Sequence, residues 1–288
     1  MAELSIGVSS SVAPLEAVLM QSPGVAFGAA FDDPAVGFLH PVDLVVAAKQ
    51  HERFRDILEG LGVAVYELAS NHPSPDSVYT YDPSWIAADG AILLRCGKAN
   101  RLGEEEAHLA FYEREGVPIV GRIEAPGTVD GGDIFYLNDG RACVGRSLRT
   151  NRDGARQLVT LLGPGTEIFD VPYDTGPSKC LHLLSVISPV AENLVVVFPP
   201  LLPSGLWDML HEMGYGLIEV PEEEMETLGC NVLAVRPGVV VMLDGNPTTA
   251  AGLAAAGVEI HTFDGSEICI NGSGGPTCLT RPLKRRQD

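Results

Sequence analysis

The sequence predicts an α/β fold of five similar units closed around a pseudo-fivefold axis. Five times along the 288 residues, a helix-like stretch ends at a glycine and a short β-branched strand follows. The glycines recur at intervals of 54, 49, 49 and 43 residues. Further short apolar strands lie between them, so each unit has the order β-β-α-β. Because no linker-like stretch separates the units, we expect a single domain over residues 1–288.

The alternative architecture is an open α/β sheet, which also alternates strands with helices. Such sheets often carry a phosphate-binding loop directly after a strand. This sequence has neither a Gly-x-Gly-x-x-Gly motif after a strand nor a Walker-type loop. The pattern therefore favours radial closure over the open sheet.

The repeated helices are expected at residues 51–61, 104–115, 151–162, 206–213 and 248–256. The glycine after each helix fits a C-terminal cap, because a left-handed backbone there meets no Cβ clash. A short buried strand begins at each of these glycines, namely Gly62, Gly116, Gly165, Gly214 and Gly257. The other strands are expected at residues 90–94, 134–137, 142–145, 194–198, 232–235 and 239–243.

The charge balance disfavours two classes of partner. The chain has 19 basic and 38 acidic residues, a net charge of −19. A protein that binds nucleic acid or an anionic membrane needs the opposite field. No window of about 18 apolar residues is present either, so we expect no membrane span. We expect the acidic runs at 104–106 and Glu222–Glu224 to be solvated helix faces or caps.

Cysteine usage and the N-terminal sequence predict a cytoplasmic protein. MAELSIGVSS lacks a basic region followed by an apolar one, so no signal peptide is evident. The six cysteines are scattered through a chain large enough to need no disulfides: Cys96, Cys143, Cys180, Cys230, Cys269 and Cys278. No Cys-x-x-Cys or His-Glu-x-x-His spacing occurs, so we expect no metal and no cofactor.

One cysteine lies in an unusual loop, Asn271-Gly-Ser-Gly-Gly-Pro-Thr-Cys278. Glycines allow a tight turn that exposes a nucleophile and let the backbone approach a ligand closely. The competing interpretation is an incidental buried cysteine, since a free cysteine is usually a small apolar residue. The other five cysteines lie in apolar or strand-like stretches, and we interpret them as buried apolar residues.

Among the seven histidines, His182 lies in an apolar run that is typical of a buried strand. It is a candidate base, although a core histidine would look the same. Two acidic segments are also unusual. Asp130-Gly-Gly-Asp133 suits either a functional site or a solvated hairpin turn. The segment 75–83 places Asp76 and Asp82 beside Tyr79 and Tyr81, and carboxylates near aromatic rings suit a flat cation.

Together these segments resemble the guanidino-modifying enzymes of the pentein superfamily. The resemblance extends from about residue 21 to residue 283. It is carried by segment 76–82, the Asp130-Gly-Gly-Asp133 turn, Arg149-Thr-Asn151, the His182 segment and Gly-Gly-Pro-Thr-Cys278. It implies a five-bladed ββαβ propeller. Within the superfamily the sequence is most similar to dimethylarginine dimethylaminohydrolases, which are relatives of arginine deiminases and amidinotransferases.

The resemblance implies a catalytic set. Cys278 matches the nucleophile, His182 the general acid and base, Asp130 the acid of the motif, and Asp82 a second acid that holds the guanidinium. The implied reaction is hydrolysis of arginine or an N-methylated arginine through a covalent thiouronium. It gives citrulline and an amine, and it needs no cofactor.

The resemblance also implies how the rest of the substrate is held. Arg95 and Arg149 match arginines that bind the α-carboxylate. Asp76 matches a residue near the α-amino end, and Tyr79 is expected to line the same pocket. The partner is then a small guanidino compound, and the assembly is compatible with a homodimer.

Two departures bear on the substrate. Arginine deiminases and amidinotransferases carry His-x-Asp, whereas this chain has Leu184 at that position. An apolar residue leaves the N–H donors of a bare guanidinium unsatisfied, which favours an N-substituted guanidine. Tyr81 stands where a further acid is expected, which leaves the polar lining open. The alternatives are arginine deiminase or amidinotransferase activity. A non-catalytic binding protein, as in the ribosome anti-association factors of this superfamily, has no need of the full catalytic set.

Overall fold

The computed structural model describes residues 4–69, 72–172 and 181–286. The described strands form five three-stranded sheets. Within the first sheet the strands lie in the order β15 (Arg281–Arg285), β1 (Leu15–Met20), β2 (Ala64–Glu67), and within the second in the order β3 (Ser84–Ile86), β4 (Ala91–Leu93), β5 (Ile119–Arg122). The third sheet contains β6 (Ile134–Tyr136), β7 (Ala142–Arg146) and β8 (Glu167–Asp170), and the fourth contains β9 (Ile187–Ala191), β10 (Leu194–Val197) and β11 (Gly216–Glu219). The fifth contains β12 (Leu233–Arg236), β13 (Val239–Leu243) and β14 (Glu259–Phe263), and in each of these three sheets the second strand lies in the middle.

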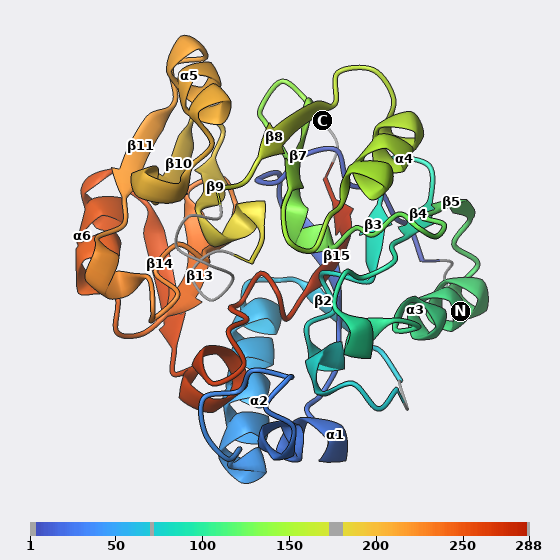
Figure 1. Cartoon of the computed structure of the whole chain (residues 1–288). Coiled ribbons are helices and arrows are strands. Elements are labelled where there is room, and N and C mark those ends of the chain that lie inside the picture. Colours follow the sequence, from blue (N-terminus) through green and yellow to red (C-terminus); the bar gives the residue numbers. More distant parts are fainter. Residues whose placement is uncertain (1–3, 70–71, 173–180, 287–288) are drawn as a thin grey trace.

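Every sheet follows the same plan. The middle strand pairs antiparallel with one neighbour and parallel with the other. The parallel connection contains a helix, as a parallel crossover requires. The α-helices are α1 (Val25–Gly28), α2 (Leu44–Gly60), α3 (Glu105–Glu115), α4 (Arg152–Leu162), α5 (Ser204–Glu212) and α6 (Pro247–Ala255). In Figure 1, α2 to α6 lie at the periphery, outside the sheets. The predicted α/β composition and β-β-α-β order are confirmed.

The repeated glycines adopt the predicted left-handed backbone, but the strands that follow them were expected to be buried and are mostly exposed or half-buried: β2, β5, β8, β11 and β14. Gly62, Gly116, Gly165, Gly214 and Gly257 all have φ between 73° and 90°, in the left-handed region. A residue with a Cβ would be strained at these positions, so the glycines allow each helix to turn back toward the next strand. The middle strands β4, β10 and β13 are apolar throughout, as expected of strands covered on both faces. All five residues of β13 are buried.

The last strand belongs to the first sheet. β15 pairs antiparallel with β1, with Leu19 opposite Arg281 and Leu15 opposite Arg285. Leu19 and Leu283 are fully buried. Because Cys278 precedes β15 by only three residues, this pairing fixes the position of the cysteine loop. The two sheet partners come from opposite ends of the chain (Figure 1).

Some elements differ from the sequence prediction. His182 was expected in a buried strand, but it directly precedes a single 3₁₀ turn, η5 (Leu183–Ser185). The Ser185 hydroxyl accepts from the His182 N–H at 3.1 Å, and the Ser185 N–H donates to the His182 carbonyl. These local bonds compete with strand pairing. Strands β1, β3, β9 and β15 were not predicted. β9 and β15 contain Pro189 and Pro282, which obscure a strand pattern.

Within the described residues, no helix has both the length and the apolar character needed to cross a membrane.

Glu224 was expected to be solvated, but it is only 5% exposed. It lies in η7 (Glu222–Glu224) and accepts hydrogen bonds from the backbone of Thr248 at 2.6 Å and of Thr249 at 2.9 Å. The Thr249 hydroxyl donates to it as well, at 2.6 Å. The carboxylate thus caps the N-terminus of α6, where a negative charge is favourable. It also anchors the loop that leads to Asn231.

We expect Glu224→Gln to lower the free energy of unfolding by about 1–2 kcal/mol, measured by urea denaturation. Burial alone would raise the pKa of Glu224, but the Thr249 hydroxyl and backbone donors outweigh it and lower that pKa. The contribution is therefore present above the pKa of the unfolded chain and is lost as the pH falls through the folded pKa. Glu223→Gln is the matched control, because Glu223 is exposed. Equal destabilisation by both variants would contradict the capping role.

Candidate active site

Seven of the eight sequence-predicted site residues line one cavity of about 370 Å³. The segments that form it come from all parts of the chain, from the loop after α1 to the loop before β15. The seven are Asp76, Tyr79, Asp82, Asp130, Arg149, His182 and Cys278. Arg95 does not line this cavity, and its Nη1 donates to the Gly127 carbonyl at 3.3 Å.

Cys278 is held by contacts on both sides. Its carbonyl accepts from the Tyr81 N–H at 3.1 Å. Asn231 Nδ2 lies 3.3 Å from the Cys278 Sγ, and Asn231 Oδ1 accepts from the Thr277 N–H at 3.0 Å. Sequence reasoning missed Asn231, because its local sequence carries no motif and its role depends on a contact between distant segments. Four other cysteines are buried, namely Cys96, Cys143, Cys230 and Cys269. Cys180 lies outside the described residues.

The surroundings of Cys278 favour the neutral thiol. Burial raises the pKa of Cys278 to about 11, and the negative charge of Asp82 acts in the same direction. The hydrogen bond from Asn231 opposes this shift, because a donor stabilises the thiolate. At neutral pH and without a ligand, the sulfur therefore carries its proton.

His182 and Asp130 form a buried pair. The His182 Nε2 lies 2.9 Å from Asp130 Oδ2, and Asp130 is 1% exposed. Burial alone would lower the pKa of His182, but the charge of Asp82 and the hydrogen bond to Asp130 raise it to about 9. Burial opposes ionisation of Asp130 too, yet the pairing with His182 keeps its pKa low. The imidazole is therefore protonated at neutral pH and can donate a proton.

The Asp-Gly-Gly-Asp motif forms a 3₁₀ turn, η4 (Gly131–Asp133), rather than a solvated hairpin. A Cβ at Gly132 would lie 2.6 Å from the His182 Nδ1, so only glycine allows this approach. Gly132 also donates its N–H to Asp82 at 2.9 Å. Asp133 is fully buried and accepts from the Leu183 N–H at 2.8 Å, which fixes the residue after His182. The motif therefore positions the imidazole from two sides.

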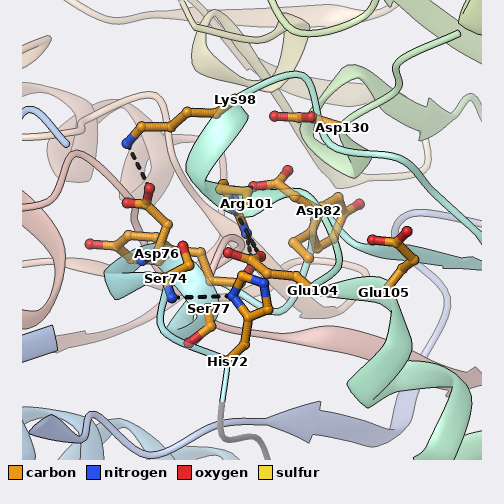
Figure 2. A network of polar contacts seen from close by, with 12 residues as sticks. His72, Ser74, Asp76, Ser77, Asp82, Lys98, Arg101, Glu104, Glu105 and Asp130 are labelled. Carbon is orange, nitrogen blue, oxygen red and sulfur yellow. Dashed lines mark hydrogen bonds and ion pairs between the residues drawn. The ribbon is translucent and has the colours of Figure 1, made fainter. Parts of the chain in front are cut away.

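Asp82 is already engaged by an arginine that sequence reasoning missed. Asp82 Oδ2 lies 2.5 Å from Arg101 Nη1, and both residues are 4% exposed. Arg101 also donates to Glu104 through Nε and Nη2, at 2.9 and 2.8 Å (Figure 2). Glu104 was expected to be solvated, but it is 2% exposed because Arg101 neutralises it. A partnered buried carboxylate is indistinguishable in sequence from an exposed one at a helix start.

Two further cations line the same cavity, Lys98 and Arg149. Lys98 Nζ lies 2.6 Å from Asp76 Oδ2 (Figure 2). Asn100 donates to the same oxygen at 3.1 Å. Arg149 is brought close by Gly97, where a Cβ would lie 2.2 Å from the Arg149 carbonyl. The Gly97 N–H also donates to Asp130 at 2.7 Å. These two cations can therefore hold a carboxylate.

The remaining predicted residue, Tyr79, lines the cavity with a satisfied hydroxyl. The hydroxyl donates to the Ile268 carbonyl at 3.2 Å, and the Tyr79 carbonyl accepts from Arg101. The two residues that depart from the family pattern, Leu184 and Tyr81, face the same cavity. Leu184 and Tyr81 line the cavity, and each is 7% exposed. The wall near His182 is therefore partly apolar.

Asp82, Asp130 and His182 could in principle hold a metal ion, since their ligand atoms lie within 4.8 Å of one another. Each of these groups is engaged, however. Asp82 pairs with Arg101, and Asp130 pairs with His182. A cation would have to displace a buried guanidinium and remove the proton of His182. The donor set therefore fits a charge-paired acid–base centre better than a metal centre.

The ligand-free protein is expected to show no Cys278 thiolate in an ultraviolet titration below about pH 9, because burial and Asp82 favour the thiol. A Cys278→Ser variant identifies the signal of this cysteine. Asn231→Ala should slow alkylation of Cys278 by iodoacetamide, because it removes a donor to the sulfur. A complete thiolate at neutral pH without a ligand would contradict the neutral state assigned to Cys278.

Comparisons with known proteins agree with this geometry. The family model described as arginine deiminase matches residues 69–206 and 202–285. N(G),N(G)-dimethylarginine dimethylaminohydrolase of Pseudomonas aeruginosa is 31% identical over 242 residues, which cover 83% of this chain and 89% of that protein. The protein YkgA of Bacillus subtilis is also 31% identical, over 85% of this chain and 82% of its own length.

A solved structure shares the fold. It is the Pseudomonas aeruginosa dimethylarginine dimethylaminohydrolase, as a cysteine-to-serine mutant complexed with citrulline. The TM-score is 0.79 at 27% identity, over 94% of this chain and 100% of that chain. Because the family model spans well over half of the sequence and relatives at 31% identity cover most of it, this chain belongs to the arginine deiminase family of the pentein superfamily.

Proposed function

We propose that the protein hydrolyses the guanidino group of an N-methylated arginine, releasing a methylated amine and leaving citrulline. One observation carries the proposal. A thiol, a protonated imidazole and buried carboxylates line the same cavity, and an apolar residue, Leu184, stands beside them. Relatives named as dimethylarginine dimethylaminohydrolases support the assignment.

The carboxylates favour a cationic substrate. Six acidic groups lie in or directly behind the cavity wall, against four cations: Asp76, Asp82, Glu104, Asp130, Asp133 and Glu226 against Lys98, Arg101, Arg149 and His182. Burial raises the pKa of Asp133 to about 6, so it too is mostly ionised at neutral pH. A bound guanidinium offsets the excess negative charge and lowers the pKa of Cys278, so that the thiol proton leaves to water. The nucleophile is then activated by the substrate itself.

The thiolate of Cys278 attacks the central guanidinium carbon and gives a neutral tetrahedral species. His182 donates its proton to the methylated nitrogen, the C–N bond breaks, and a covalent thiouronium remains on Cys278. The neutral imidazole then takes a proton from water as the oxygen attacks the same carbon. The C–S bond breaks, the thiolate recovers a proton, and the ureido product leaves.

The lining of the cavity favours a methylated guanidine over a bare one. A methylated nitrogen has fewer N–H donors and more apolar surface than a bare one. Leu184 and Tyr81 offer no carboxylate for such donors, and they fit methyl groups. Arg149 and Lys98, which line the same cavity, supply cations for the α-carboxylate. Asp76 is the carboxylate that can bind an α-amino group there, and Lys98 already neutralises part of its charge.

We also propose that residues 1–288 form one domain and that its five sheets close into a ring. Contacts between neighbouring units support this. β15 contacts β3, β1 contacts β12, and β12 contacts β9. Trp85 of β3 donates to the hydroxyl of Tyr136 in β6 at 3.2 Å, and η5 contacts both β6 and β9. Each unit thus touches the next, and the last touches the first.

The proposed activity is tested with arginine, monomethylarginine and asymmetric dimethylarginine side by side, following ureido product and released amine together. We expect kcat/KM to be at least ~10-fold higher for the methylated substrates, because Leu184 leaves bare N–H donors unpaired. Cys278→Ala should abolish turnover.

The same experiment includes Leu184→Asp, with Leu184→Asn as the uncharged control. The aspartate variant should shift the preference toward arginine, and the asparagine variant should do so less. Faster turnover of arginine by the natural chain, with release of ammonia, would make the protein an arginine deiminase instead. Product formation only in the presence of an added amine acceptor would indicate amidino transfer.

Arg149→Ala is expected to raise KM about 10–100-fold with kcat nearly unchanged, because a carboxylate anchor binds ground state and transition state alike. Arg95→Ala removes the same charge from a residue that does not line the cavity, and it should leave KM unchanged. Steady-state kinetics on the preferred substrate measure both variants. An unchanged KM for Arg149→Ala would overturn the assignment.

A further inference from the structure

A second, smaller cavity of about 30 Å³ adjoins the catalytic cavity. Tyr81, Leu184 and Thr277 line both, so these three residues form the wall between them. The small cavity is also lined by Arg281 and Arg285 of β15. In an extended strand, residues four apart lie on the same face, and both side chains point inward here. Arg281 is 1% exposed and Arg285 is 4% exposed.

Neither buried arginine has an acidic partner among the described residues. Arg281 donates through Nη1 to the carbonyls of Tyr81 and Ser84, at 2.9 and 2.7 Å. Its Nε is buried and has no hydrogen-bond partner within the described part of the chain. Arg285 donates to the carbonyls of Ala13 and Ala234, at 2.6 and 2.8 Å. This contrasts with Arg101, whose guanidinium is neutralised by two carboxylates.

The aromatic neighbours compensate only part of this charge. The Arg281 guanidinium lies 4.0 Å from the centre of the Tyr81 ring and 4.6 Å from that of Trp85. Such contacts stabilise a cation by about 0.5–2 kcal/mol, which is less than the cost of burying an unpaired charge. Burial, together with the neighbouring charge of Arg281, lowers the pKa of Arg285 to about 10, whereas Tyr81 acts in the opposite direction. The two guanidinium groups therefore repel each other in a desolvated space.

The hydroxyl groups of the cavity are arranged to donate as well. Ser10 Oγ accepts from the N–H groups of Val12 and Ala13, at 3.1 and 3.0 Å. Ser11 Oγ accepts from the Tyr136 N–H at 2.8 Å. Because both oxygens already accept, their O–H protons remain available to a further partner. No carboxylate is found among the described residues that line this cavity.

We propose that this cavity binds one small monovalent anion of the chloride class between Arg281 and Arg285. The guanidinium groups of Arg281 and Arg285 and the hydroxyls of Ser10 and Ser11 are its donors. The cavity has room for at least one body the size of a water molecule, which suits a halide. The ion neutralises Arg281 and Arg285, as Asp82 and Glu104 neutralise Arg101. The site does not depend on the proposed catalytic function.

Thermal unfolding in chloride, with gluconate keeping the ionic strength constant, tests the proposal. A site-bound ion should raise Tm saturably, by about 2–4 °C at chloride well above its dissociation constant. The rise should be lost in Arg285→Met. It should persist in Arg286→Met, which removes the neighbouring arginine, whose side chain is 63% exposed. A rise that does not saturate and is equal in both variants would overturn the proposal.

A second measurement does not require a variant that folds. Crystals of the natural chain grown in bromide are examined by anomalous scattering. We expect a bromide peak inside the small cavity, between the guanidinium groups of Arg281 and Arg285. A map with no peak there, or with bromide only near Lys98 and Arg149 in the catalytic cavity, would overturn the proposal.

Discussion

The pairing of β15 with β1 is the constraint on which the rest of the site depends. It joins the two ends of the chain in one sheet and fixes the segment that carries Cys278, only three residues before β15. The Tyr81 N–H binds the Cys278 carbonyl, so the same segment is tied to the loop that carries Asp82. The thiol, the acid and the buried arginines of β15 are therefore placed by a single set of backbone contacts.

Acidic groups predominate on one side of this segment, and two arginines lie on the other. On the catalytic side, carboxylates outnumber cations, and each buried acid has a partner that keeps it ionised or oriented. Asp130 has His182, Asp82 has Arg101, and Asp133 has backbone and hydroxyl donors. Behind Tyr81 the sign reverses, and two guanidinium groups share a space without acids. The wall of Tyr81, Leu184 and Thr277 thus separates regions of opposite charge.

Much of the fold could be predicted from the sequence, because helix-capping glycines and apolar middle strands leave local signals. At Gly62 and Gly257, for example, the glycine itself predicts the left-handed turn that the structure shows. The candidate catalytic residues were found only through their order along the chain. Asn231 and Arg101 were missed, because each acts through contacts with a segment distant in sequence. Glu104 and Glu224 look exposed in sequence, and only their partners show why they are buried. Arg95 sits in a suggestive motif, yet its side chain turns toward the Gly127 carbonyl.

The position of β15 also has a consequence for how the chain folds during synthesis. β1 is made first, but its antiparallel partner follows more than 250 residues later. Until then one edge of the first sheet stays unpaired, and such an edge is open to wrong partners. This gives the first sheet a contact of very long sequence separation, which slows folding. The cysteine loop therefore reaches its final position only after β15 has been made and has paired with β1.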